Sequence, residues 1–397
     1  MKDKIDKIND YINIIMIAIF VIARILRNSF FYYTTEKGGI WNYISLYFLL
    51  QFIYLFIIKN IFIKKTIKKT HLIFYFYIFY IWILNIYQVL IYNQNTYINI
   101  YKMFMFPFFI YIFIISYYKK INIYILSKYY SYIFYIVTVI NIISFILFYK
   151  KILQFVMVSN VYYSLCLFPY TLINKKKIDL KSFFLMGICL ILSNKRAGVV
   201  AFILCFFSLF VFSSKKIKKQ ILSIIICSIC LGNIIFFGFK EEIQNIRLFK
   251  RITISQMIKD KGSNRLDIYK KIINDYSNLE LDKKILGTYQ KDIEKNTGHD
   301  NVHNDFLEIL YTKGMISLVI FILIYFYYFI VFFKMQKKNF LFKGIYLFIL
   351  NISLILSMLS VYFIDFGYSI VGAGLIGYLI SEWENKKEQK WKIENIQ

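Results

Sequence analysis

Apolar residues fill most of the chain in long blocks that short polar segments separate. A helix that crosses the hydrocarbon core of a bilayer needs roughly 20 predominantly apolar residues. The pattern therefore predicts an all-α integral membrane protein with about twelve transmembrane helices. The predicted helices cover residues 10–32, 41–62, 71–92, 97–118, 130–149, 154–174, 178–194, 197–213, 220–239, 307–333, 344–363 and 366–382.

One long segment, residues 240–306, contains no block of spanning length and holds many of the acidic residues. It separates the first nine predicted helices, within 1–239, from the last three and a tail, within 307–397. Loops of this length are usually functional or disordered. Because residues 266–276 mix apolar and charged positions at helical spacing, we expect short surface helices in this loop.

Clusters of lysine set the predicted orientation in the membrane. Cytoplasmic loops carry an excess of Lys and Arg, and here the basic clusters follow every second predicted helix. These clusters lie at residues 64–69, 119–128, 175–177, 215–219 and 334–343. The pattern predicts that both termini are cytoplasmic and that the 240–306 loop is extracytoplasmic.

The composition excludes a soluble enzyme and gives the high positive charge a simple explanation. Hydrophobic residues make up 59% of the chain and aromatic residues 21%, whereas a globular domain is about 45–50% apolar. A net charge of +27 would suggest a nucleic-acid partner in a soluble protein. Here the lysines lie mostly where the positive-inside rule places them, so we expect no nucleic acid.

Arginines are rare, and all fall on the predicted outer side. Only six of the 49 Lys and Arg residues are arginines, namely Arg24, Arg27, Arg196, Arg247, Arg251 and Arg265. Arginine offers a planar fork that binds phosphate through two parallel hydrogen bonds, which lysine cannot do. For Arg24 and Arg27, snorkelling to the membrane interface is the alternative reading. Arg196, in a tight turn before Gly198, is a stronger candidate for binding.

Two histidines lie near the end of the long loop. His299 and His303 have metalloprotease spacing, but the glutamate that such a helix requires is missing and no third ligand is present, so we predict no metal. His303 suits proton transfer or hydrogen bonding, with an ordinary interface histidine as the alternative. Helical spacing places His303, Leu307, Leu310 and Gly314 on one face, and Gly314 would admit a neighbouring helix.

These residues together permit one kind of chemistry. Arginine forks in a membrane-embedded site suggest a diphosphate carried on a lipid. The sequence has no acidic cluster of the kind that a divalent ion needs. Fixed arginine charge could stabilise a departing diphosphate, and a histidine could take the proton of an attacking hydroxyl. This combination describes glycosyl transfer from a polyprenyl-diphosphate donor.

Three motifs within residues 180–330 resemble the O-antigen ligase and O-antigen polymerase family of bacterial envelope enzymes. They are the Ser193–Gly198 turn around Arg196, the Arg265–Tyr269 segment followed by Gly287, and the pair His303 and Asn304 with Gly314 after them. The third motif is the most specific. Two places depart from the family pattern: the turn at Arg196 continues Ala-Gly-Val-Val where many relatives have leucine, and Tyr269 stands where tryptophan is common.

The resemblance implies a metal-independent, inverting glycosyltransferase without a cofactor, in the inner (cytoplasmic) membrane of a bacterial cell. Arg196 and Arg265 would hold the undecaprenyl diphosphate of a lipid-linked oligosaccharide, and His303 would be the base or would orient the acceptor. The acceptor would be a lipid A-core sugar or a second lipid-linked glycan. Further candidate substrate-binding residues are Asn304, His299, Arg247 and Arg251. Asp300 and Asp305 are alternative bases.

Several functions stay open at this point. The spacing from histidine to glycine favours a ligase slightly over a repeat-unit polymerase, and a capsule or teichoic-type polymerase is a further alternative. A lipid-linked oligosaccharide flippase would also have about twelve helices, but its cationic residues should line both leaflets. A scaffold without chemistry is the remaining alternative. The sequence leaves open the sugar, the linkage, the oligomeric state and the roles of Arg24, Arg27 and Asp365.

Overall fold

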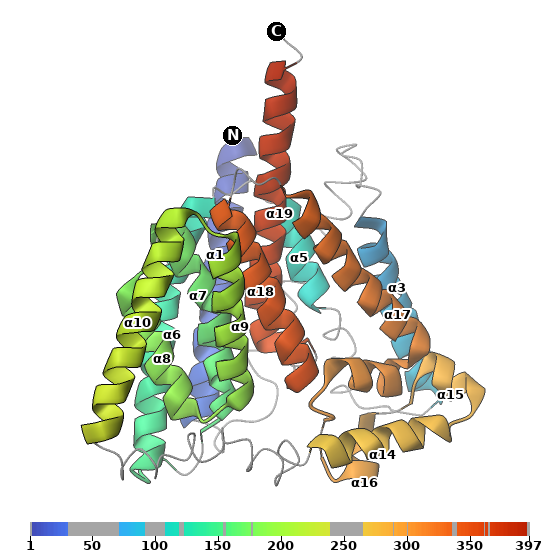
Figure 1. The fold of residues 1–397 in the computed structure, drawn as a ribbon. Coiled ribbons are helices and arrows are strands. Elements are labelled where there is room, and N and C mark those ends of the chain that lie inside the picture. Colours follow the sequence, from blue (N-terminus) through green and yellow to red (C-terminus); the bar gives the residue numbers. More distant parts are fainter. Residues whose placement is uncertain are drawn as a thin grey trace. The chain divides into compact units, whose positions relative to one another are not determined.

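The computed structural model describes residues 2–30, 71–91, 108–118, 123–153, 156–175, 178–238, 265–288, 290–299, 301–335, 340–360, 362–363 and 366–394. All regular elements among these residues are helices (Figure 1). They are α1 (Lys2–Phe30), α3 (Leu72–Ile91), α5 (Phe108–Tyr118), α6 (Ile123–Tyr149), η3 (Val158–Asn160), α7 (Val161–Lys175), α8 (Leu180–Ser193), α9 (Arg196–Phe212), α10 (Lys215–Gly238), α14 (Arg265–Ser277), α15 (Leu281–Leu286), α16 (Gln290–Thr297), α17 (Asp305–Lys334), α18 (Phe340–Leu359) and α19 (Phe366–Glu394).

Three helices in the described part of the chain are long and apolar enough to cross a membrane. They are Ile123–Tyr149, Asp305–Lys334 and Phe342–Leu359. Shorter apolar helices cover Leu72–Gln88, Leu180–Ser193 and Arg196–Phe212. These helices support the predicted all-α membrane protein. The count of twelve spans stays a prediction, and the predicted helix 41–62 lies outside the described residues.

Several predicted helix boundaries are wrong: α1 begins at Lys2 rather than at 10, α10 begins at Lys215 rather than at 220, and α19 continues to Glu394 rather than ending at 382. Helix α6 begins at Ile123 rather than at residue 130. Lys128, which we expected in a loop, therefore lies on the exposed surface of this helix. Lysine is a good helix former, so a charged residue does not end a helix by itself. Helix α7 begins at Val161 rather than at 154, after the short 3-10 helix η3.

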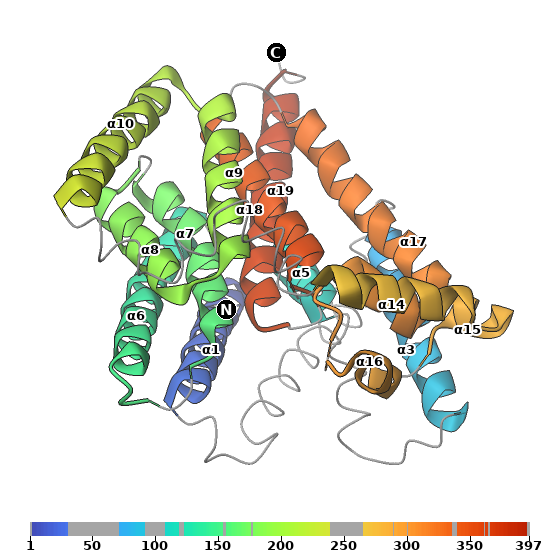
Figure 2. The same ribbon diagram turned by 60° about the horizontal axis from the view of Figure 1, so that its bottom comes forward.

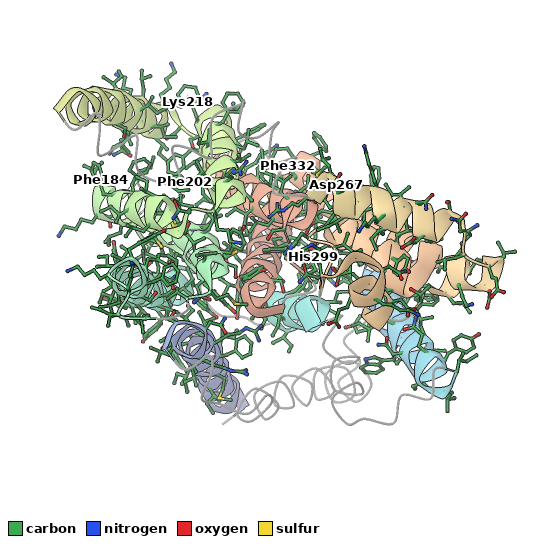
Figure 3. All side chains as sticks on the ribbon, turned by 90° about the horizontal axis from the view of Figure 1, so that it is seen from below. Phe184, Phe202, Lys218, Asp267, His299 and Phe332 are labelled. Atoms are coloured by element: carbon green, nitrogen blue, oxygen red, sulfur yellow. The ribbon has the colours of Figure 1, made fainter. Side chains whose placement is uncertain are left out.

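The chain forms two compact units, of which the first comprises residues 1–35, 120–262 and 335–352. In it, α6 packs against α1, α7 and α8, and α9 packs against α7 and α10. A buried polar network joins these helices: the amide of Asn28 donates to Asn160 at 3.2 Å, and the amide of Asn141 donates to the Asn160 carbonyl at 3.1 Å. Phe202, labelled in Figure 3, packs edge-on against Phe168 at 5.5 Å between ring centres.

The second unit comprises residues 36–119, 263–334 and 353–397. Its most extensively packed helix pair, among the described residues, is α5 and α19. They approach so closely that a Cβ atom on Gly377 would lie 2.6 Å from the carbonyl oxygen of Phe113. Only a residue without a side chain allows two helix backbones to come this near.

Three short helices of the second unit gather around the first part of α17 (Figures 1 and 2). Helix α14 covers the amphipathic stretch 266–276, as predicted. Its apolar face closes a small core. That core consists of Ile268, Ile272, Ile293, Val302 and Tyr311. The outer placement of this segment stays a prediction, but its packing fixes α14 against the residues that follow His299.

Candidate functional site at the start of helix α17

Helix α17 is interrupted at Gly314, whose backbone has φ 77° and ψ 176°. A Cβ atom there would lie 2.0 Å from the carbonyl oxygen of Ile285, at the end of α15. Gly287, with φ 84°, lies against the backbone of Thr312, where a Cβ atom would be 2.4 Å from the carbonyl group. The predicted close approach at Gly314 is confirmed, and its partner is the C-terminal end of α15. Glycines of two predicted motifs therefore meet at one crossing.

The predicted helical face from His303 to Gly314 is wrong. Helix α17 begins at Asp305, and His303 lies before it in a left-handed conformation with φ 58°. Asn304 is the N-cap, because its side-chain oxygen accepts the N–H of Leu307 at 3.1 Å. The kink at Gly314 then ends the first helical part. The spacing of residues alone does not predict that the helical segment 305–313 lies between an N-cap at Asn304 and a kink at Gly314.

Three hydrogen bonds hold the backbone around His303. The Val302 N–H donates to the Glu308 carboxylate at 3.0 Å. The Tyr269 hydroxyl donates to the carbonyl oxygen of His303 at 3.1 Å. Together with the Asn304 cap, these bonds fix the residues before, at and after the histidine, whose side chain is half-buried.

Tyr269 remains a hydrogen-bond donor at neutral pH. Burial raises the pKa of its hydroxyl, although the Arg265 charge and a hydrogen bond with the Asn304 side chain act in the opposite direction. A protonated hydroxyl can donate to the His303 carbonyl. Tyr269 therefore connects the arginine motif with the histidine motif.

Residues of both motifs converge on the C-terminal end of α18. Arg265 donates from its guanidinium to the carbonyl oxygen of Leu359. The side-chain amide of Asn304 donates to the Met358 carbonyl at 3.2 Å, and Tyr269 is 3.4 Å from the same oxygen. The last carbonyls of a helix have no partner within the helix, so they attract donors. Arg265, His303 and Asn304 are thus brought together within the second unit.

Asp305 is a structural residue in this arrangement. Its carboxylate is fully buried and accepts the backbone N–H groups of Tyr362, at 3.0 Å, and Phe363, at 2.8 Å. These bonds attach the turn after α18 to the start of α17. The geometry therefore argues against the alternative that Asp305 is the base.

The other predicted site residues lie elsewhere or outside the described part. Arg196 is the first residue of α9 in the first unit, after a turn in which Asn194 is left-handed, as the predicted tight turn requires. His299 is exposed in the loop after α16, where Figure 3 labels it. Arg247 and Arg251 lie outside the described residues. Asp300 and Asp365 lie there as well.

Sequence reasoning missed a buried polar cluster beside the Gly314 kink. The Lys313 ammonium donates to Asn85 at 2.8 Å and to Gln88 at 3.0 Å, both on α3. Gln88 in turn donates to the Thr312 carbonyl at 2.8 Å. A charged residue inside an apolar helix was the available signal, because such residues are costly and usually have a specific partner.

The cluster around His303 combines groups suited to anion binding and proton transfer. Arg265, on α14, supplies a permanent cation. His303 supplies an imidazole from the loop that Tyr269 of α14 contacts. Within the described ranges, no three His, Cys, Asp or Glu side chains are grouped as metal ligands would be. No protein-family model and no curated protein sequence matches this chain.

Proposed function

We propose that this protein transfers a glycan from an undecaprenyl-diphosphate carrier to a sugar acceptor on the outer face of a bacterial inner membrane. One observation carries the proposal: the Arg265 guanidinium and the backbone of the His303 loop, far apart in the sequence, converge on the end of α18 through Tyr269 and Asn304. The apolar pattern of a membrane protein does not require this meeting. A diphosphate-dependent transfer does require a cation and a proton acceptor at one place.

The chemistry follows from the charges that develop. When the bond between the sugar and the diphosphate breaks, negative charge grows on the leaving oxygen, and a fixed guanidinium such as Arg265 stabilises it. His303 accepts the proton of the acceptor hydroxyl as that oxygen attacks the sugar carbon from the opposite face. Configuration at that carbon is therefore inverted. The role of Arg196, in the other unit, rests on the family resemblance alone.

The end of a candidate spanning helix supports a site at a depth that suits a lipid-linked substrate. Leu359, whose carbonyl binds Arg265, is the last residue of the candidate span Phe342–Leu359. The end of a spanning helix marks the boundary between hydrocarbon and headgroups. A polyprenyl diphosphate has its charged group at this boundary. The proposal includes twelve spans, cytoplasmic termini and an extracytoplasmic 240–306 loop.

The direct test supplies purified protein with undecaprenyl-diphosphate oligosaccharide, with and without a lipid A-core acceptor, and measures product mass. Growth of the lipid-linked glycan by whole repeats identifies a polymerase, and transfer only in the presence of core identifies a ligase. We favour the ligase. Absence of product from folded protein with its native glycan would refute glycan transfer and favour a transporter.

Three variants test the assigned residues. Removing one charge-stabilising donor typically costs about 10²–10³ in rate, so we expect Arg265→Lys, which keeps the charge but loses the fork, to lose most activity. His303→Ala should lose about 10²–10⁴. The matched control is Lys270→Ala, an exposed cation on the same helix, which should keep full activity. Full activity in His303→Ala would remove the histidine from the mechanism.

The proposed orientation has its own test. Single cysteines introduced on the exposed side of α14, for example at Asn274, should react with an impermeant thiol reagent added outside intact cells. A cysteine at Lys216, in the predicted cytoplasmic cluster 215–219 and the exposed first turn of α10, should react only after the membrane is opened. The reverse pattern would overturn the topology and with it the location of the site.

A further inference from the structure

Two carboxylates in the first turn of α17 are almost completely buried. Asp305 is 0% exposed and Glu308 1% exposed. A buried carboxylate is costly unless hydrogen bonds satisfy it. Asp305 accepts N–H groups of the turn after α18, whereas Glu308 accepts the N–H of Val302, directly before His303. The two acids therefore hold different backbone segments, and Glu308 acts on the histidine loop.

The backbone conformation of His303 needs such support. A residue with a side chain at φ 58° is in the left-handed region, which is sparsely populated except by glycine. Strained conformations of this kind persist only when the surrounding structure over-determines them. Glu308 holds the amide before His303, and Tyr269 holds the carbonyl of His303 itself. Without the bond between Val302 and Glu308, the loop could relax so that His303 leaves the left-handed region, and its imidazole would then change position.

We propose that Glu308 is a positioning residue that fixes the left-handed turn at His303 by accepting the N–H of Val302. Its role needs an acceptor oxygen and a side chain of this length, and it does not need a negative charge or contact with substrate. The catalytic consequence rests on the proposed function. The conformational consequence stands without it.

Two substitutions separate these requirements. Glu308→Gln keeps an acceptor oxygen at the same place and removes the charge. Glu308→Met has a similar length without an acceptor. The matched control is Glu294→Gln, an exposed acid on α16. Each protein is measured for kcat, for KM with the lipid-linked donor, and for hydrogen exchange of the backbone amides of residues 302–304 by mass spectrometry.

We expect Glu308→Gln and the control to keep the wild-type kcat and the wild-type protection of these amides. Glu308→Met should lower kcat by about tenfold or more, equivalent to about 1.4 kcal/mol, with KM nearly unchanged. A loss in kcat alone means that an interaction needed in the transition state is missing, while donor binding is intact. Exchange at residues 302–304 should become faster in Glu308→Met only.

Either of two results would overturn the inference. Equal loss of activity in Glu308→Gln and Glu308→Met would show that the charge itself matters, and wild-type activity with wild-type exchange in Glu308→Met would show that the bond does not. If Glu308→Met does not fold, Glu308→Gln decides: loss of activity or of protection overturns the inference, and retention of both supports it. If even the wild type transfers no glycan, the exchange measurement still decides the positioning role, so the two failures are distinguishable.

Discussion

Among the glycines of the kink region, Gly314 should be the one whose replacement by alanine lowers the stability of the protein most. The backbone there, at φ 77° and ψ 176°, lies in a region that is essentially reserved for glycine. Forcing another residue into it costs about 1–3 kcal/mol. The new Cβ atom would also lie 2.0 Å from the Ile285 carbonyl oxygen, where 3.4 Å is the lower limit of ordinary contact.

Relief of this clash requires movement of backbone. Because the obstructing atoms belong to the main chain of α15 rather than to a side chain, no rotamer change can remove the overlap. Overpacking of this kind costs a further 1–3 kcal/mol or so. The two terms together give about 4 kcal/mol of destabilisation. At 2–4 °C for each kcal/mol, the thermal midpoint should fall by about 10 °C.

Two other glycines separate the contributions. Gly298 has a similar φ of 74°, but a Cβ atom there meets nothing within 4 Å, so Gly298→Ala tests the backbone term alone. We expect it to cost about 1–2 kcal/mol. Gly187 is inside α8 with open space around it, and Gly187→Ala should be neutral or slightly stabilising. The assay heats purified protein and measures the folded fraction by size-exclusion chromatography. Equal midpoints for Gly314→Ala and Gly298→Ala would refute the steric argument.

Three further outcomes are expected. Gly377→Ala should lower the thermal midpoint by the equivalent of about 2 kcal/mol, because its Cβ would lie 2.6 Å from a backbone oxygen of α5, while Gly374→Ala, at 3.4 Å from its nearest neighbour, should not. Asn160→Leu should destabilise the first unit by about 2–3 kcal/mol, measured in the same assay, since it leaves buried partners without hydrogen bonds. Tyr269→Phe should fold normally but lower kcat about fivefold, because the His303 carbonyl loses a bond of about 1 kcal/mol; an unchanged kcat would contradict this.

The helices were predictable wherever an apolar block was long, because only a helix satisfies its own backbone in lipid. The break between α8 and α9 was also predictable, since Ser193–Gly198 combines polar residues with glycine, and the structure places a left-handed Asn194 there. The start of α7 was not predictable. The apolar run continues through residues 154–160, and what ends it is the tertiary contact of Asn160 with Asn28 and Asn141.

At the candidate site, the sequence indicated which residues belong together but not how they are held. The order of the motifs suggested Arg265, His303 and Gly314. The left-handed histidine depends on Glu308, and the meeting with α14 depends on the hydroxyl of Tyr269. Both contacts end on backbone atoms, which are the same in every residue. A pattern of side chains therefore carries no signal for them.

The kink at Gly314 also determines how the protein can respond to bilayers of different thickness. Residues 315–334 rise by about 30 Å as a helix, which matches the hydrocarbon core without the preceding turns. A spanning helix that is longer than the hydrocarbon core tilts, and around one that is shorter the bilayer becomes locally thinner. Because Gly314 separates this segment from residues 305–313, such a tilt can pivot at the glycine. We expect the loop carrying His303 to keep its place against the small core of α14 and α16 when the bilayer thickness changes, because Val302 is part of that core.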